Sequence, residues 1–303
     1  MTRTSRNGLI AAAFLAPSIA GFLAFTLVPV ITSGALSFFE WDLITAPRFI
    51  GIENYTKLLG FVRDDAGRLA ASDPRFWFYL YNTLFLMLAI PLSMSGSLAL
   101  ALALNRRVAF AVGLRTIYFI PSMCVPVAVF LLWKWLLDGD YGLLNYLLAR
   151  VGVKGPAWLA SPGWAKPAII LVSMWAGIGG YNMILYLAGL QNIPRDLYEA
   201  ATIDGAGAWR QFRHITWPLL TPTTFFVLVM SVIGGFQGGF EAAYMMTRGG
   251  PAGSTTTIGY YIYNQAYEWF NMGYAAAISW ILFLLVLGVT LLNWKYGGRR
   301  VHY

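Results

Sequence analysis

Residues Asp196–Pro222 read DLYEAATIDGAGAWRQFRHITWPLLTP and form a polar interruption between apolar segments of the chain. The apolar segments before and after it are long enough to cross a bilayer, which takes about 20 mostly apolar residues each. The interruption itself is short, amphipathic and densely patterned. We therefore interpret it as a surface that membrane-crossing helices hold in place and present to a soluble partner.

The composition of the chain is that of an integral membrane protein. Of its 303 residues, 58% are hydrophobic and 11% are charged, whereas soluble domains have roughly 45–50% and about 25%. The formal net charge of +8 fits the Lys and Arg residues that membrane proteins keep in their cytoplasmic loops. Because no basic stripe with interleaved aromatic residues occurs, we expect no nucleic acid partner.

The sequence contains no metal-binding or ATP-binding motif. Cys124 is the only cysteine, and His214 and His302 have no partner at ligand spacing, so we expect neither an intrachain disulfide nor a metal site. No Gly-Lys pair occurs, which rules out a P-loop of the GxxxxGK[ST] type. Because the sequence also lacks a paired-carboxylate or nucleophile–base set at a membrane face, we expect no catalytic residues and no cofactor in this chain.

Six apolar stretches predict an all-α integral membrane fold in a single domain, residues 1–303. The first run is about twice as long as the 7–15-residue core of a signal peptide, so we expect it to remain as a span. Prolines inside the spans are expected to be tolerated, because neighbouring helices and side chains satisfy the freed carbonyls. A short interfacial helix is expected at Gly142–Arg150. The predicted spans cover about residues 9–39, 76–104, 116–137, 167–190, 219–236 and 272–294.

The distribution of basic residues predicts the orientation in the membrane. With a cytoplasmic N-terminus, the inner segments hold eleven of the 21 Lys and Arg residues in about half as many positions as the outer loops. Both termini and the Asp196–Pro222 segment are therefore expected in the cytoplasm. The eleven residues are Arg3, Arg6, Arg106, Arg107, Arg115, Arg195, Arg210, Arg213, Lys295, Arg299 and Arg300.

The residue types of the polar interruption predict two helices joined by a turn. Pro194 suits a first helical turn, and Asp196 complements the positive end of the helix dipole. Gly205 and Gly207 fit the turn, because glycine adopts left-handed backbone angles without steric cost. Small residues form one face of the first helix, and Trp209 begins the apolar side of the second. Such a segment could lie on lipid headgroups or pack against another protein, and its alanine face favours the protein.

The same segment resembles the EAA loop of bacterial ABC-importer permeases, and in particular of the carbohydrate-uptake group that includes the maltose and glycerol-phosphate permeases. The resemblance covers nearly the whole chain, including Phe49–Leu58 and Asp73–Thr83. About ten residues near Val62–Ser72 look inserted relative to the family pattern. The positions that match the EAA loop are Glu199, Ala200, Ala201, Asp204, Gly205, Ala206, Phe212, Ile215, Pro218 and Pro222.

The resemblance implies that residues 191–218 are a cytoplasmic coupling helix–turn–helix that docks into a cleft on an ATPase. It implies a second homologous permease subunit as heterodimer partner, two cytoplasmic ATPase subunits that bind ATP and Mg, and an extracytoplasmic sugar-binding protein. It also implies a sugar substrate and the lipid of a bacterial inner membrane as surroundings. The implied ATPase-coupling residues are Glu199, Ala200, Ala201, Asp204, Gly205, Ala206 and Phe212.

Sugars offer apolar C–H faces and many hydroxyls, so aromatic rings combined with hydrogen-bonding groups suit them. The family resemblance places the sugar near the fourth and fifth spans. Glu241 could instead pair with Arg248, and the aromatic residues could belong to interfacial belts. The substrate-binding candidates are Trp175, Tyr181, Asn182, Phe236, Gln237 and Glu241. The residues that stand where family members are usually bulkier, which bears on the substrate pocket, are Gly234, Gly235, Gly238 and Gly239.

Two other functions stay open from the sequence. An ion-gradient-driven secondary transporter would place ionisable relays or broken helices at the membrane midplane, whereas the predicted spans contain almost no acidic residues. An ABC permease for a non-sugar solute, such as a peptide or a polyol, is the other alternative, because the sequence discriminates poorly among solutes.

Overall fold

The computed structural model describes the backbone of residues 3–63, 67–106 and 110–297, and the side chains of these ranges from residue 12 to residue 295. This part of the chain is mostly helical. It divides into two compact units, residues 1–74 with 262–281 and residues 75–261 with 282–303. Arg107, Arg299, Arg300 and His302 lie outside the described residues, as do residues 64–66 of the stretch that looks inserted.

The first unit carries the N-terminal helix and the loop that follows it. Two short antiparallel hairpins, which the sequence did not predict, pair Phe39 with Phe49 and Phe61 with Ala71. They fold the loop back on itself. The elements are α1 (Arg3–Phe22), a π-helical turn (Leu23–Leu27), α2 (Val28–Leu36), β1 (Phe39–Glu40), β2 (Arg48–Phe49), α3 (Glu53–Leu59), β3 (Phe61–Arg63), β4 (Leu69–Ala71), a π-helical turn (Asn264–Glu268) and the start of α16 (Met272–Gly297).

The second unit contains most of the remaining helices. The short helix predicted at Gly142–Arg150 is present as α8, with Gly142 directly before its first residue; its location at the membrane interface stays a prediction. The elements are α4 (Pro74–Leu86, whose first residue belongs to the other unit), α5 (Ala89–Leu104), α6 (Ala111–Met123), α7 (Pro126–Leu136), α8 (Leu143–Arg150), α9 (Pro162–Gly177), α10 (Gly180–Gln191), α11 (Arg195–Ile203), α12 (Ala208–Gln211), a π-helical turn (Phe212–Thr216), α13 (Trp217–Gln237), α14 (Phe240–Ala242), a π-helical turn (Ala243–Thr247) and α15 (Ile258–Tyr263, which ends in the other unit).

Length and composition mark four described helices as able to cross a membrane: Ala12–Leu36, Pro74–Leu104, Ala208–Gln237 and Met272–Lys295. Two further apolar stretches are pairs of helices with a bend between them, and counting each pair as one span makes six. A six-span arrangement therefore remains a prediction, with four of its members present as uninterrupted helical stretches.

The prolines inside the predicted spans differ in their effect on the helix. Pro121 does lie inside α6, but α6 and α7 meet at 95° because Pro126 begins a new helix. The residue before a proline disfavours helical angles, and Val125 is accordingly extended (φ −62°, ψ 123°). The fourth predicted span bends by 45° between α9 and α10, where Gly179 has a φ of +108°.

Two other prolines follow π-helical turns instead of breaks. The turns Leu23–Leu27 and Phe212–Thr216 each end two residues before a proline, Pro29 and Pro218. Proline lacks an N–H and its ring crowds the carbonyl four residues earlier, and a wider turn moves those carbonyls. The helix consequently runs without a break from Ala208 to Gln237. The expected second short helix is thus not separate but continuous with the helix that contains the predicted fifth span, residues 219–236.

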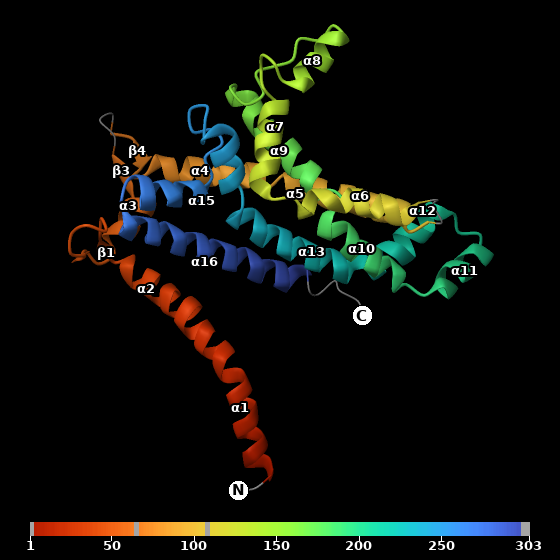
Figure 1. Cartoon of the computed structure of the whole chain (residues 1–303), viewed down its shortest axis with the longest axis horizontal. Coiled ribbons are helices and arrows are strands. Elements are labelled where there is room, and N and C mark those ends of the chain that lie inside the picture. The colour runs from red at the N-terminus through yellow and green to blue at the C-terminus, as the bar shows by residue number, and fades with distance from the viewer. Residues whose placement is uncertain (1–2, 64–66, 107–109, 298–303) are drawn as a thin grey trace. The chain divides into compact units, whose positions relative to one another are not determined.

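The core of the second unit is formed by α5, α10 and α13, which lie side by side in Figure 1. One cluster of buried side chains joins them, and it includes Ala101 and Leu104 from α5, Tyr186 from α10 and Leu220 from α13. Tyr198 of α11 packs against the same cluster. The core thus connects α11, which follows α10, to the long helix that contains α13.

Candidate functional site

A cavity of about 290 Å³ lies within the second unit. Its wall is made by seven helices and by the residue before α15, so it exists only because these elements pack together. The lining residues are Thr83, Leu86, Met87, Ala89, Ile90, Ser93, Phe130, Ile169, Ser173, Gly177, Asn182, Ser231, Gly234, Gly235, Gly238, Gly239, Ala242 and Thr257.

The lining of this cavity is uncharged and mostly apolar, with a minority of polar groups. Hydroxyl groups come from α4, α5, α9 and α13, and Asn182 adds an amide, whereas none of the described lining residues carries a charge. Phe130 provides the one aromatic ring among them. Hydroxyls and amides both donate and accept hydrogen bonds. The cavity can therefore bind a neutral molecule that is rich in hydroxyl groups. The hydroxyl residues are Thr83, Ser93, Ser173, Ser231 and Thr257.

The four glycines singled out in the sequence all line this cavity, at the end of α13 and just beyond it. A Cβ atom added at Gly234 would meet nothing within 4 Å, whereas one added at Gly235 would lie 2.8 Å from Ile90 Cδ1. Gly234 therefore leaves open space in the cavity, and Gly235 allows close packing against α5. A side chain at position 234 would fill the cavity.

The predicted substrate residues do not gather at one place. Asn182 lines the cavity. Trp175 packs edge-on against Trp133 with ring centroids 5.5 Å apart, and Tyr181 packs against Phe119 at 5.4 Å. The other three are Phe236, which is buried, and Gln237 and Glu241, which are exposed. The alternative pair of Glu241 with Arg248 is not formed; both side chains are exposed.

The hydroxyl residues of the cavity were missed by the sequence analysis. Ser173 and Ser231 each stand alone in an apolar run, Ser93 is one of three serines in the run 91–100, and Thr83 and Thr257 are 174 positions apart. The available signal was weak, namely small polar residues in segments otherwise composed of large apolar ones. Only the packing of the helices brings them together.

The turn after α11 has the geometry that its residues predict. Gly205 has a φ of +73°, and its N–H donates to the carbonyl of Thr202 at 3.0 Å. The N–H of Ala206 donates to the carbonyl of Ala201 at 2.8 Å. This pair of bonds is a Schellman motif, which satisfies the last carbonyls of a helix and places a left-handed residue directly after it.

Side-chain bonds hold α11 against the beginning of the long helix. The hydroxyls of Tyr198 and Thr216 lie 2.9 Å apart. The amide of Gln211 donates to the hydroxyl of Thr202 at 3.0 Å and to the carbonyl of Ala206 at 3.2 Å. The segment is thus a defined structure that moves with the helix behind it.

This helix–turn segment is exposed along its length. No residue of α11 or α12 is buried, and Ile203 and Trp209 are 86% and 70% exposed. A cleft of about 510 Å³ lies beside it, lined by residues that include Asn105, Tyr198 and Trp209. Of the coupling candidates, the exposed ones are Glu199, Ala200, Asp204 and Gly205, and the half-buried ones are Ala201, Ala206 and Phe212.

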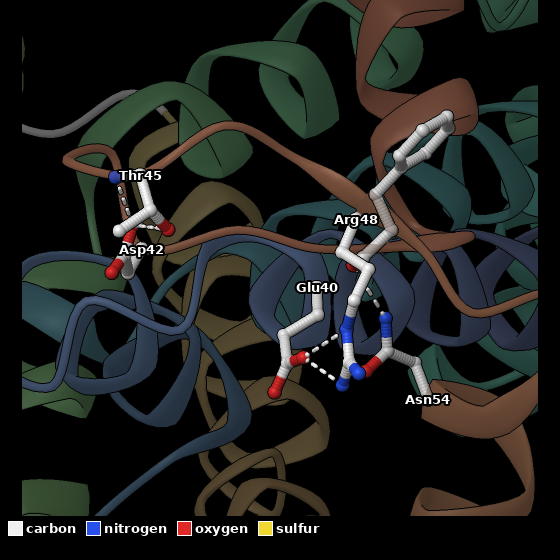
Figure 2. Close-up of polar contacts among 6 residues, drawn as sticks. Glu40, Asp42, Thr45, Arg48 and Asn54 are labelled. Atoms are coloured by element: carbon white, nitrogen blue, oxygen red, sulfur yellow. Dashed lines mark hydrogen bonds and ion pairs between the residues drawn. The ribbon is translucent and has the colours of Figure 1, made fainter.

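A polar pocket of about 360 Å³ lies in the first unit. Several of the polar side chains that line it bond to groups of the same unit. Figure 2 shows Arg48 donating to the carboxylate of Glu40, 2.5 Å from its Oε2 atom. Both side chains are largely exposed, and such pairs contribute about 0–1 kcal/mol. The amide of Asn54 donates to the carbonyls of Ser37 and Phe39. We assign no binding role to this pocket.

Asp42 closes the loop beside that pocket. Its carboxylate accepts hydrogen bonds from the N–H and hydroxyl of Thr45, at 2.7 and 2.9 Å, and from the N–H of Ile44 at 3.0 Å (Figure 2). These bonds favour the charged form, those from Thr45 most, and lower the pKa of Asp42 below its usual value of 3.8. The role of Asp42 is to shape the turn.

Comparison with known proteins gives consistent matches. The profile of the family described as "Binding-protein-dependent transport system inner membrane component" matches residues 70–295. The chain is 36% identical to the probable ABC transporter permease protein YesP of Bacillus subtilis (strain 168), over 98% of this chain and 93% of that protein. It is 36% identical to the lactose transport system permease protein LacF of Rhizobium radiobacter, over 95% of this chain and 93% of that one.

A solved structure has the same fold. It is a crystal structure of a bacterial alginate ABC transporter in complex with an alginate pentasaccharide-bound periplasmic protein. One of its chains superposes with a TM-score of 0.82 at 25% sequence identity, and the match covers 97% of this chain and 96% of that one.

Proposed function

The chain belongs to the family of inner-membrane components of binding-protein-dependent transport systems, and from that premise we propose that it is a permease subunit of an ATP-driven sugar importer. Members of this family are ABC transporter permeases, which are transport subunits and not enzymes. The several long apolar helices fit a multi-pass protein of the inner membrane. In the proposed complex this chain forms half of the translocation pathway.

The uncharged cavity, whose mostly apolar wall carries several hydroxyls and one amide, is the observation that carries the choice of a sugar. A sugar that leaves water loses hydrogen bonds at many hydroxyls, and burial without replacement is costly. Ser173, Ser231 and Asn182 offer both donors and acceptors. The open space at Gly234 leaves room for a ring. A relative that is named for lactose transport supports the same choice.

The long helix from Ala208 to Gln237 suggests how ATP hydrolysis would reach the cavity. At a rise of about 1.5 Å per residue, a helix carries a displacement at Ala208 to Gly234 over roughly 40 Å. The exposed α11 and its glycine turn are bonded to the start of that helix through Tyr198 and Gln211. We infer that ATPase closure moves α11, and that this movement rocks the helix and changes access to the cavity.

The proposal includes the partners that the EAA-like segment implies. They are a second homologous permease, two cytoplasmic ATPases that bind ATP and Mg, and an extracytoplasmic sugar-binding protein. In this arrangement both termini and residues 191–218 face the cytoplasm. The exposed apolar side chains Ile203 and Trp209 support a protein partner at that surface. The chain itself would carry no nucleotide.

The proposal is tested by reconstituting the complex in lipid vesicles and measuring ATP-driven uptake of radiolabelled mono- and disaccharides. The double variant Glu199→Ala/Gly205→Pro removes the acidic residue and forbids the left-handed turn, since proline is locked near a φ of −65°. We expect uptake and ATPase association to fall at least about tenfold, because loss of a central contact costs about 2 kcal/mol or more.

The matched control is Gly207→Ala. Gly207 has a φ of −68°, and an added Cβ would meet nothing within 4 Å, so uptake should remain near the native level. Uptake that persists without any ATPase and follows a proton or sodium gradient would overturn the proposal in favour of a secondary transporter. ATP-driven uptake of peptides but of no saccharide would overturn the choice of sugar.

A further inference from the structure

The loop from Arg248 to Thr257 joins two helical elements; it leaves Arg248 and Ala252 exposed but is buried at its end. Its last four residues, Ser254–Thr257, are all buried, and Thr255 is inaccessible to solvent. Within the loop, the Thr255 hydroxyl donates to the carbonyl of Gly250 at 2.9 Å and lies 2.6 Å from the hydroxyl of Thr247. The end of the loop is thus tightly packed, and its final residue, Thr257, lines the cavity.

One face of α4 holds this loop. Tyr79, Asn82 and Thr83 follow the i, i+3, i+4 spacing that places residues on the same side of a helix. The ring of Tyr79 packs edge-on against Tyr261 with centroids 5.0 Å apart. The hydroxyl of Thr83 accepts a hydrogen bond from the N–H of Ile258 at 2.9 Å. The bonds from α4 therefore reach the residue directly after Thr257.

Asn82 makes the central contact of this face. It is inaccessible to solvent, and its amide nitrogen donates to the carbonyl of Gly253 at 2.9 Å and to that of Thr256 at 3.0 Å. Because the two carbonyls are three residues apart, one amide determines both the position and the direction of the chain that leads into Thr257.

We propose that Asn82 is a positioning residue of the solute pathway: it ties the 248–257 loop to α4 and thereby places Thr257 in the cavity wall. The inference rests on the proposed function of the cavity. Asn82 does not itself line the cavity. Thr257 faces the end of α13 there, since a Cβ built on Gly239 would lie 3.0 Å from its Cγ2 atom. A shift of the loop would widen the gap between Thr257 and Gly239.

The chain contains a matched control for this arrangement. Asn145 also donates its amide to two carbonyls, that of Gly139 before α8 at 2.8 Å and that of Pro156 after α8 at 3.1 Å. Neither of these two connections supplies a residue to the cavity. Removal of Asn145 therefore removes a contact of the same chemistry without touching the wall that Asn82 is proposed to place.

The first arm of the test measures the accessibility of position 257 and needs no substrate. Cys124 is the only cysteine, so Cys124→Ser gives a background in which Thr257→Cys can be labelled by a small methanethiosulfonate reagent. Adding Asn82→Ala should speed labelling about tenfold, the size expected when one or two net hydrogen bonds no longer oppose local opening. Adding Asn145→Ala should leave the rate within about twofold of the background.

An unchanged labelling rate in a correctly inserted Asn82→Ala protein would overturn the proposal, and so would an equal acceleration by Asn145→Ala. Where Asn82→Ala fails to insert, Asn82→Leu keeps the volume and removes both donors, and the same rate comparison decides. The second arm is selectivity, read as the uptake of a monosaccharide relative to a disaccharide in the reconstituted complex.

A displaced wall should change this uptake ratio by about threefold or more, whereas a merely less stable protein would lower both rates equally. An unchanged ratio together with faster labelling would overturn the positioning role in transport. If the native complex imports no saccharide, the proposed function fails while the labelling arm still tests the tie between Asn82 and the loop.

Discussion

The 248–257 loop and the α11–α12 segment are both polar connectors between helices of the second unit, yet they are built in opposite ways. The 248–257 loop buries its threonines and satisfies them internally, as Thr255 does with Gly250. The α11–α12 segment buries no residue and leaves Ile203 and Trp209 in solvent. A polar connector in the sequence can therefore become either a packed loop with buried side chains or an exposed surface segment.

The difference teaches what each connector can do. A buried loop whose hydrogen bonds close on itself resists local opening, so it suits a wall that must keep its shape. An exposed helix with apolar side chains on its surface can bury them against a partner protein, so it suits a docking surface. The same substitution should therefore destabilise the protein more in the 248–257 loop than in the α11–α12 segment. The following predictions test that difference.

The largest effect is expected from a pair of glycine substitutions. Gly249 and Gly205 have φ values of +77° and +73°, so alanine costs about 1–2 kcal/mol of backbone strain at either. At Gly249 the new methyl would also collide with the hydroxyl of Thr256 and lie 3.1 Å from the ring of Tyr260, whereas at Gly205 it would meet nothing within 4 Å.

Gly249→Ala should therefore destabilise the protein by about 2–5 kcal/mol in all, because overpacking adds about 1–3 kcal/mol to the strain. Thermal unfolding of the purified protein, followed by tryptophan fluorescence, gives the comparison. Equal shifts of the unfolding midpoint for Gly249→Ala and Gly205→Ala would contradict the contrast between a packed loop and a free one.

A smaller effect is expected from a pair of threonine substitutions. Thr255→Val removes a buried hydroxyl and leaves the carbonyl of Gly250 without this donor, which costs about 1–3 kcal/mol. Thr202→Val removes an exposed hydroxyl that donates to the carbonyl of Tyr198 at 2.7 Å and accepts a bond from Gln211 at 3.0 Å. Because water can replace both partners at an exposed site, we expect a loss of about 0.5 kcal/mol, the low end for a hydrogen bond. Chemical unfolding of the two variants measures both values, and a Thr202→Val protein as unstable as Thr255→Val would count against the assignment.

The smallest effect is a pH dependence in the first unit, where the Asp42 turn is exposed but closes on itself. Because hydrogen bonds lower the folded pKa of Asp42 below 3.8, their contribution is fully present above that value and is lost as the pH falls through the folded pKa. Hydrogen exchange at Ile44 and Thr45, corrected for the intrinsic rate, should keep its protection above pH 3.8 and lose it only as the pH falls further, through the folded pKa. Protection that stays the same at a pH at which Asp42 is protonated would show that the carboxylate does not hold the turn.

Local features of the chain were predictable wherever a few neighbouring residues decide them. The short helix α8 begins after Gly142 as expected, and the turn at Gly205 has the left-handed angle that glycine favours. The prolines were harder, because Pro121 lies inside a helix whereas Pro126 starts a new one. The result at each proline depends on whether the preceding turn can widen or the chain must bend, which residue type alone does not reveal.

The candidate functional residues likewise include some that the sequence predicted and others that it did not. The coupling segment was visible because its residues lie within one stretch of sequence at fixed spacing. The cavity was only partly visible: Asn182 and the α13 glycines were singled out, while Ser93, Ser173 and Thr257 were not. The sequence around a hydroxyl residue in an apolar run is the same whether the hydroxyl bonds to its own helix or faces a cavity. The packing of the neighbouring helices determines which of the two occurs.

The sequence by itself determined that this chain is a helical membrane protein with an exposed amphipathic turn, because apolar length and glycine angles are properties of single segments. The tertiary structure decided where the cavity lies, which hydroxyls line it and which asparagine holds its wall. Those properties depend on contacts such as that between Asn82 and Gly253, which are 171 positions apart. Such contacts form only when the helices have packed.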